Sequence, residues 1–389
     1  MANKKKTTSY AARSGGKTTP IGKSGSSSKS SSKSATKSSS HSSAGYRRPS
    51  GGKKNGKLNW AFIVAGAILL STYLIVVVFN GFDWPGWDDG VSDLKDSASG
   101  VVSSVESAWS EVKDAHGSSP EDLVLDTPGG SVSGEVRVHF IDVGQGDCML
   151  IEGNGESVLI DAGENDKGDE VLAYLAGVKI EKIDLAFGTH PHSDHIGGMD
   201  TVIEGIPVGK LLMPDVPDSI VPTTRTFLSM LDAADAQGTE TLFAYPGDSF
   251  SVCGGTLSVL GPVEDYKDLN NESLVMRFDF GKTSFLFTGD QEADAEEDLL
   301  ASGADVSADV LKIGHHGSST STCQDFFDAV SPSIAVIECG EGNDYGHPHR
   351  ETRQLLDKAG IDVYRTDLNG SIVITSDGEA LTVQTEKAG

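Results

Sequence analysis

The stretch THPHSDHIGG, residues 189–198, places three histidines and one aspartate within six positions. Histidines this close together add little to packing, whereas neutral imidazole and carboxylate are common ligands of Zn²⁺, Mn²⁺ and Fe²⁺. In an extended or turn segment, His190 and His192 point to the same side and can bind one ion. Asp194 and His195 follow closely enough to bind a second ion. The spacing predicts a two-metal site, and a solvated polar loop is the weaker interpretation.

The same residue types stand where other predicted strands end. They are Asp161 in VLIDAG, Asp290 in FLFTGD, His315 and His316 after VLKIG, and His347 and His349 after AVIECGEGNDYG. Together with His190, these residues mark five strand ends, which favours one convergent site at an edge of sheets rather than ordinary loop polarity. Asp290 is the natural bridge between two ions, because a carboxylate can offer one oxygen to each.

Short apolar runs that read as strands alternate with helical stretches from residue 136 onward. VRVHFIDV alternates apolar and polar residues, and ESVLIDAG is an apolar run that ends in glycine. Helices are expected at residues 170–175, 226–237, 293–301 and 351–358. The pattern predicts a layered α/β fold whose loops carry the site, in one domain over residues 135–386.

The composition changes sharply along the chain. Residues 1–57 hold fourteen Lys or Arg and no acidic residue, whereas residues 58–389 carry 17 basic and 57 acidic residues, a formal charge of −40. The first segment is rich in Ser, Lys and Gly and cannot bury enough apolar surface to fold, so we expect it to be disordered. Such a tail could bind nucleic acid or anionic lipid, but the apolar run after it favours a tail that sets membrane orientation.

Residues 60–79, WAFIVAGAILLSTYLIVVVF, form a run of twenty residues without a charge. A helix of this length spans about 30 Å, the thickness of the hydrocarbon core of a bilayer. A cleaved signal peptide would have a shorter apolar region, so we expect an uncleaved signal-anchor over residues 58–82. Lysines precede the run and aspartates follow it, which predicts a single-pass protein of the cell membrane with a cytoplasmic N-terminus and an extracellular domain.

Residues 88–115 have a heptad-like period. Apolar residues recur at steps of three and four: Val91, Leu94, Ala98, Val101, Val105, Ala108 and Val112. This predicts a stalk helix that either forms a short coiled coil, and so a homo-oligomer, or rests as a single amphipathic helix on the membrane or the domain. The Pro-, Gly- and Ser-rich residues 116–134 are the expected linker.

The motif THPHSDHIGG resembles the signature of the metallo-β-lactamase superfamily. The ordered motifs FIDVGQGDCMLIE, LIDAG, NNESLVMRF, FTGD, VLKIGHHGS, GNDYGHPH and YRTDLNGSIVI are similar to the C-terminal metallo-β-lactamase-like domain of the competence protein ComEC and its stand-alone relatives. The resemblance covers residues 136–377. It implies an αββα sandwich, two divalent ions (Zn²⁺ or Mn²⁺), and hydrolysis of a phosphodiester, with DNA as the expected substrate, by a hydroxide that bridges the metals.

The resemblance also implies roles for individual residues. His190 and His192 would bind the first metal; Asp194, His195 and His347 would bind the second, with Asp290 as the bridge. Many members have a further histidine before the bridging aspartate, but residues 196–289 contain none. Asn270, Asn271 or Ser273 of LNNES could stand near the first metal in its place, or His315 could complete that site from the other side.

Further residues are expected around the metals. Asp161 would orient the histidine loop by accepting a hydrogen bond from the N–H of a metal-bound imidazole, or would only cap the loop structurally. His315 or His316 would protonate the departing oxygen, and Lys312 and Ser318 would bind phosphate oxygens. His349 stands at the start of a predicted helix, a position that favours an anion or ordinary capping. In DVGQGD, Asp142, Gln145 and Asp147 would orient metal ligands or close a turn.

The acidity of the domain argues against extensive nucleic-acid binding, which depends on phosphate neutralisation by Lys and Arg. The alternatives are hydrolysis of a small phosphodiester or a lactone, or a non-catalytic surface binding protein with a vestigial metal site. One apolar run cannot form a channel, so a role in DNA uptake would require competence-type translocation partners. The four cysteines lack metal-binding spacing and are expected to be buried thiols.

Overall fold

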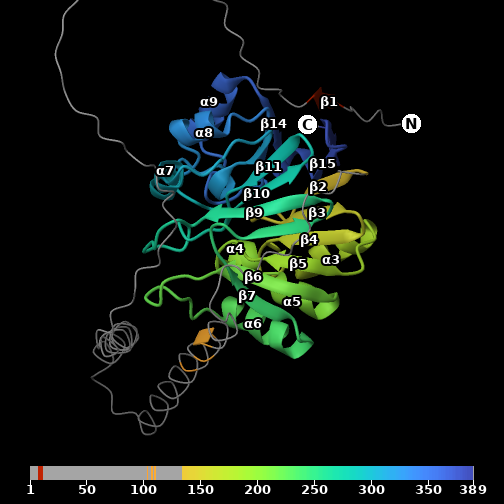
Figure 1. The fold of residues 1–389 in the computed structure, drawn as a ribbon, viewed down its shortest axis with the longest axis vertical. Helices are drawn as coiled ribbons and strands as arrows, with labels where there is room; N and C mark the ends of the chain where they lie inside the picture. Colours follow the sequence, from red (N-terminus) through yellow and green to blue (C-terminus); the bar gives the residue numbers. More distant parts are fainter. Residues whose placement is uncertain (1–7, 12–102, 104–106, 108, 111–133, 389) are drawn as a thin grey trace, which may run out of the picture. The chain divides into compact units, whose positions relative to one another are not determined.

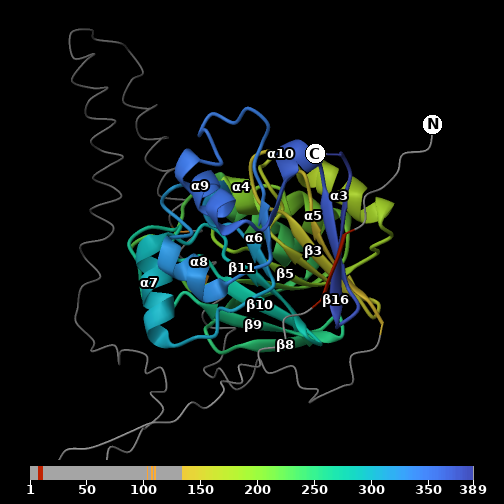
Figure 2. The same cartoon turned by 90° about the horizontal axis from the view of Figure 1, so that it is seen from above.

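The computed structural model describes residues 8–11, 103, 107, 109, 110 and 134–388. Two β-sheets form the centre of the domain, and helices cover their outer faces (Figure 1). The helices α3, α5 and α6 lie on one side, and α7, α8 and α9 lie on the other. Figure 2 shows the same domain seen from above. The predicted α/β sandwich is therefore confirmed for this part of the chain.

The first sheet has nine strands. Their order is β1 (Thr8–Ala11), β16 (Ala380–Thr385), β15 (Ile372–Ser376), β2 (Val136–Phe140), β3 (Met149–Gly153), β4 (Glu156–Ile160), β5 (Ile183–Phe187), β6 (Val208–Pro214) and β7 (Glu240–Ala244). The strands from β16 to β4 pair antiparallel, and those from β4 to β7 pair parallel. Parallel strands need crossover connections, and α5 and α6 supply two of them.

The second sheet has seven strands. Their order is β14 (Asp362–Arg365), β13 (Ile334–Ile337), β12 (Val310–Lys312), β11 (Thr283–Phe287), β10 (Val275–Phe280), β9 (Gly255–Gly261) and β8 (Ser249–Val252). It repeats the plan of the first sheet, because β8 to β11 pair antiparallel and β11 to β14 pair parallel. The carboxyl ends of parallel strands from both sheets therefore become available for a site.

The helices of residues 134–388 include the four that the sequence predicts and four that it does not. They are α3 (Gly168–Gly177), α4 (Ser193–Ile196), α5 (Met199–Gly205), α6 (Arg225–Gln237), α7 (Ala293–Ser302), α8 (Gln324–Val330), α9 (Arg350–Ala359) and α10 (Thr366–Asn369). All four predicted helices are present. In α6, the Thr224 hydroxyl accepts from the backbone N–H of Phe227, and Gly238, with φ 70°, ends the helix in the left-handed conformation.

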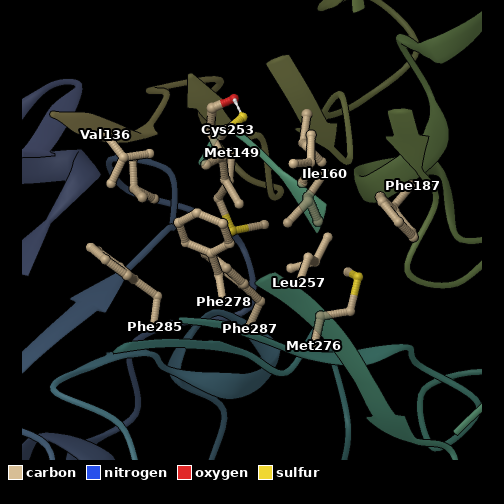
Figure 3. Close-up of a cluster of buried hydrophobic side chains, with 14 of the residues drawn as sticks. Val136, Met149, Ile160, Phe187, Cys253, Leu257, Met276, Phe278, Phe285 and Phe287 are labelled. Carbon is tan, nitrogen blue, oxygen red and sulfur yellow. Dashed lines mark hydrogen bonds between the residues drawn. The ribbon is translucent and has the colours of Figure 1, made fainter. Parts of the chain in front are cut away.

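The main core lies between the sheets. Figure 3 shows Phe278, Phe285 and Phe287 of the second sheet together with Met149 and Ile160 of the first. All of these side chains are buried, because alternate residues of each strand point to the inner face. Two further apolar clusters fill the spaces between each sheet and its helices. The packed layers hold the loops at the strand ends in fixed positions.

The N-terminal predictions fall mainly outside the described residues. The span predicted at 60–79 lies there, and within the described residues no helix is both long and apolar enough to cross a membrane. Thr8–Ala11 pair antiparallel with β16, so the prediction of a wholly disordered tail is wrong for these four residues. Most of the predicted stalk and linker also lies outside the described residues.

One residue of the predicted stalk makes a clear contact with the domain. Trp109 is 5% exposed, and its ring lies 4.7 Å from Phe243 and 5.7 Å from Phe227 between ring centroids. Trp109 joins the cluster between the first sheet and α6. This contact matches the alternative in which the segment rests on the domain. It does not belong to the heptad pattern, which passes through Ala108 and Val112.

Candidate metal centre

The predicted ligands come from the carboxyl ends of parallel strands in both sheets. His190 follows β5, and Asp194 and His195 lie in the short helix α4 just after it. Asp290 follows β11 and His316 follows β12. This convergence fits the expectation from strand ends, and it places the site where loops from the two sheets meet.

Four side chains form a compact cluster. One ligand atom each from Asp194, His195, Asp290 and His316 lies within 4.8 Å of the others. The His195 Nε2 atom lies 3.2 Å from Asp290 Oδ1. The His316 Nε2 atom lies 3.2 Å from Asp194 Oδ2 and 3.6 Å from Asp290 Oδ2. Two imidazoles and two carboxylates at this spacing suit a divalent ion such as Zn²⁺ or Mn²⁺.

Two buried atoms of this cluster have no hydrogen-bond partner among the described residues. They are His195 Nε2 and Asp290 Oδ1, which face each other without hydrogen-bond geometry. Buried polar atoms are rarely left unsatisfied, and one ion between them would satisfy both. The residues present therefore fit a divalent metal.

The charges of the cluster support the same conclusion. Burial lowers the pKa of His316, but the carboxylates of Asp290 and Asp147 outweigh it and raise the pKa to about 10. Burial likewise opposes protonation of His195, whereas Asp290 and Asp161 raise its pKa well above the usual value. The carboxylates thus require positive charge in this space. A divalent ion supplies it when the histidines bind as neutral ligands.

His190 and His192 lie side by side, as the spacing predicts. His190 Nε2 is 2.9 Å from His192 Nδ1, and burial lowers the pKa of His190 well below its usual value. Neutral imidazoles of this kind can bind a metal. Among the described residues, no compact group of three His, Cys, Asp or Glu ligand atoms includes either histidine. The third ligand of the predicted first metal site therefore stays unassigned.

The LNNES segment contributes in a different way from the one expected. Ser273 Oγ lies 3.3 Å from His190 Nδ1 and accepts from the backbone N–H of Asp290 at 3.0 Å, so it holds both residues in place. Asn271 bonds to Asp268 and accepts from the backbone N–H of Glu292. Within this segment, Asn270 lines an open cavity that is also lined by Asp194, Asp290 and His316.

Asp161 occupies the position behind His195. Its carboxylate lies 2.8 Å from His195 Nδ1 and accepts from the Thr189 backbone N–H at 2.8 Å and from the Thr189 hydroxyl at 2.7 Å. A carboxylate that binds the far nitrogen of an imidazole fixes its orientation and directs the other nitrogen to the metal. The contacts therefore agree with an orienting role rather than with a loop cap alone.

A second buried carboxylate stands behind His316. Asp147 Oδ1 lies 3.1 Å from His316 Nδ1, and the Lys312 amine pairs with the other oxygen of Asp147. Burial raises the pKa of Asp147, but the charges of Lys312 and His316 hold it below the usual value. Lys312 is completely buried, which corrects the prediction that it binds a substrate phosphate. The sequence feature that could have indicated this burial is the position of Lys312 inside the apolar run VLKIG.

The backbone at the site is in an uncommon conformation. Asp161, His315 and His316 have φ values of 59°, 49° and 54°. The left-handed region costs a residue with a side chain about 1–2 kcal/mol, so the surrounding structure must hold these residues in place. The strain occurs at residues that the chemistry of the site uses.

His315 and His347 lie around an open cavity of about 280 Å³. His315 Nε2 is 3.5 Å from Asp290 Oδ2, and His315 Nδ1 is 3.2 Å from Glu292 Oε1. The ring centroid of His347 is 5.6 Å from that of His315 and 6.1 Å from that of His316. Burial, followed by the charges of His316 and His315, lowers the pKa of His347 to about 4. Its assignment to the second metal stays a prediction, because His316 is the histidine that contacts Asp194.

Ser318 and His349 lie at the edge of the site. The Ser318 hydroxyl is 3.0 Å from the Thr320 hydroxyl. His349 accepts from the Ser319 backbone N–H at 2.9 Å and lies 3.2 Å from the Tyr345 carbonyl oxygen. His349 therefore joins two loops. Two residues of the cavity wall, Gln145 and Tyr345, were not assigned a substrate role from the sequence.

Comparison with known proteins agrees with this geometry. Residues 141–340 match the model of the metallo-beta-lactamase superfamily, and the chain belongs to this superfamily. It is 33% identical over 260 residues to ComE operon protein 3 of Bacillus subtilis, covering 62% of this chain and 33% of that protein. It is 31% identical over 257 residues to Recombination protein 2 of Haemophilus influenzae, covering 64% and 30%. With Competence protein ComA of Neisseria gonorrhoeae it shares 29% identity over 243 residues, covering 61% and 32%. The chain thus spans about a third of the length of these relatives.

Proposed function

We propose that this protein is a metal-dependent phosphodiesterase that cleaves DNA or oligonucleotides. The observation that carries the proposal is the cluster of Asp194, His195, Asp290 and His316, with its two unsatisfied buried atoms. The names of the relatives, which refer to competence and recombination, support nucleic acid as the substrate. Divalent ions held by the cluster would activate water and stabilise charge on the phosphoryl oxygens.

The protein side chains orient this chemistry. Asp161 binds His195 Nδ1, and the Glu338 carbonyl oxygen lies 3.1 Å from His316 Nδ1 beside the Asp147 carboxylate, so that the Nε2 atoms of both histidines face the same space. Both histidines line the cavity, but His316 contacts the carboxylates of Asp194 and Asp290, whereas the side chain of His315 is 22% exposed and is the better candidate to protonate the leaving oxygen. Among the residues considered as general acids, His315 therefore takes this role.

Gln145 supplies a hydrogen-bond donor to the cavity. Its Oε1 atom accepts from the Gly340 backbone N–H at 3.2 Å, which fixes the orientation of the amide. Its Nε2 atom is buried and has no partner among the described residues. A fixed donor at a reacting centre stabilises developing negative charge, so we assign Gln145 to a phosphoryl oxygen of the substrate.

The test is cleavage of a single-stranded oligonucleotide by the full-length chain with Mn²⁺ or Zn²⁺, together with the metal content per chain. Asp194→Asn should abolish cleavage. Asp169→Asn removes the same charge at an exposed position of α3 and should leave cleavage unchanged. A metal-loaded protein that cleaves no oligonucleotide would exclude this substrate, and a chain that binds no metal would favour a binding protein with a vestigial site.

A small phosphodiester or a lactone is the second candidate substrate. It is favoured by the charge of residues 58–389, formally −40, which repels a long polyanion. Among the residues that the structure describes, none that lines the cavity is Lys or Arg. Cleavage of bis(p-nitrophenyl) phosphate without cleavage of any oligonucleotide would support this candidate.

We also propose that the protein is anchored through residues 58–82, with the domain outside the cell. The support is the uncharged run of twenty residues and the charge difference across it. Self-association through residues 88–115 and contact with competence-type translocation partners belong to the same proposal. Cross-linking of the membrane-bound chain would test the first of these.

A further inference from the structure

Tyr345 lies in the loop between β13 and α9, and it is unusually exposed for an aromatic side chain. It is 66% exposed, more than any other large apolar side chain that the structure describes. The other exposed large apolar side chains among the described residues are Leu368, which is 53% exposed, and Val363, which is 37% exposed. An aromatic ring left in water forgoes the free energy of burial, so its position invites a functional explanation.

The ring is part of the wall of the candidate active site. Tyr345 lines the same cavity as Asp194, Asp290 and His316. Its ring is stacked on that of His347, with centroids 5.6 Å apart and planes at 22°. Since His347 covers one face and the side chain is mostly exposed, the other face is open to a planar ligand.

The loop that carries Tyr345 is held in a defined conformation. The Asn343 amide donates to the carbonyl oxygens of Gly340 at 2.9 Å and His347 at 2.7 Å, and accepts from the His347 backbone N–H at 2.9 Å. His349 Nε2 lies 3.2 Å from the Tyr345 carbonyl oxygen. A ring fixed in advance loses little conformational entropy when a ligand binds to it.

The chemistry of the cavity favours stacking over charge as the means of binding. The cavity wall contains no Lys or Arg among the described residues, so phosphate neutralisation by side chains is weak. Stacking of a nucleobase on an aromatic ring needs no positive charge and tolerates any base sequence.

We propose that Tyr345 is a stacking platform for the nucleobase next to the scissile phosphate. The substrate class is then a nucleotide-bearing phosphodiester rather than a lipid phosphodiester or a lactone. This proposal rests on the proposed phosphodiesterase function and identifies the group that the same site recognises. Tyr345 sets affinity for the base, while the reaction itself remains with the metal-binding residues.

The test compares two substrates with the metal-loaded full-length chain: a single-stranded decamer, and a decamer of the same backbone without bases. Tyr345→Ala should raise the KM for the first substrate roughly 5- to 100-fold with little change in kcat, because one base stack is lost. It should not change cleavage of the second. Tyr345→Phe should behave as the wild type, and Tyr345→Leu, which keeps apolar bulk without a ring, should behave as the alanine variant.

A binding measurement gives an independent readout. Fluorescence of 2-aminopurine in a phosphorothioate decamer should be quenched on binding to the wild type and to Tyr345→Phe, but not to Tyr345→Leu. Equal losses of Tyr345→Ala on both substrates, or no loss on either, would overturn the platform while leaving the phosphodiesterase intact. A wild type that cleaves neither decamer nor bis(p-nitrophenyl) phosphate would overturn the proposed function itself.

Discussion

At the scale of single residues, each of the two clustered histidines has a buried carboxylate behind it, and His316 Nδ1 also lies 3.1 Å from the Glu338 carbonyl oxygen. Asp161 contacts His195, and Asp147 contacts His316, both from fully buried positions. Groups of this kind do not touch the metal, yet they set the direction and basicity of the imidazole that does.

Asp161→Asn should therefore weaken metal binding without removing a ligand. The amide has nearly the same size, but it presents an NH₂ group that can face His195 Nδ1 and disfavour the tautomer needed for binding through Nε2. We expect the affinity for Zn²⁺ to fall about 10- to 100-fold, measured by competition with a chromophoric chelator. Asp169→Asn serves as the control, and an unchanged affinity in Asp161→Asn would contradict the orienting role.

Lys312→Met should destabilise the domain, because it leaves the buried charge of Asp147 without its partner. Loss of one member of a buried ion pair costs about 3–5 kcal/mol. The free energy of unfolding, measured in urea with EDTA present, should fall by this order. The double variant Lys312→Met with Asp147→Asn should recover part of the loss, and strict additivity of the two changes would argue against the pair.

The sequence predicted the residues of the site better than their contacts. His190, His192, Asp194 and His195 could be identified because their spacing is local. The contact of His316 with Asp194 joins residues 122 positions apart, and no local pattern distinguishes it from His347. Lys312 was misassigned because a lysine is usually exposed, and its burial depends on Asp147, which lies 165 positions away.

At the scale of elements, the loop between β9 and β10 carries both Ser273, which holds the site, and a buried acid. Burial raises the pKa of Glu272 to about 8, and the charges of Asp265 and Asp268 add to this effect, although a hydrogen bond from the Tyr266 backbone N–H opposes it. The protonated form is therefore the one that the folded state prefers.

This preference predicts a pH dependence of stability. A carboxyl group whose folded pKa exceeds its unfolded value of 4.5 contributes stability that is fully present below pH 4.5 and is lost as the pH rises through about 8. Relative to Glu272→Gln, the wild type should lose up to about 1.4 kcal/mol per pH unit across this window. Urea unfolding at pH 5, 6.5 and 8.5 would show it, and parallel profiles would contradict the raised pKa.

The elements themselves were largely predictable. The helices α3, α6, α7 and α9 were predicted as helical stretches, and the strands β2 to β5, β10 to β13 and β15 follow from apolar runs. The helices α4, α5, α8 and α10 and the turn at residues 314–317 were not predicted as elements. Their positions depend on contacts between distant segments, such as the bond from the Asp147 backbone N–H to the Asp194 carbonyl oxygen.

At the scale of the whole molecule, the predictions for the part of the chain before residue 134 are the ones that the described residues test least. The heptad pattern suggested self-association, but the described contact of this segment is that of Trp109 with Phe227 and Phe243 of the domain. Amphipathic periodicity shows that a helix has an apolar face and does not show what covers that face.

The two ends of the chain present a conflict that one experiment can decide. Residues 8–11 pair with β16, yet a single membrane span at residues 60–79 would put them on the opposite side from the domain. Both cannot hold within one membrane-bound chain. The lysines before the run and the aspartates after it favour the span, because the charge difference sets orientation.

We therefore expect a cysteine at position 10 to be shielded in intact cells. In a Cys323→Ser background, because Cys323 is the one cysteine that is not buried, Tyr10→Cys should react with a membrane-impermeant maleimide only after permeabilisation. Asp169→Cys, at an exposed position of the domain, should react without it. That result would mean that β1 and β16 of one anchored chain lie on opposite sides of the membrane and do not pair with each other. Labelling of both cysteines in intact cells would instead contradict the single span, and it would allow the pairing of β1 with β16 within one chain.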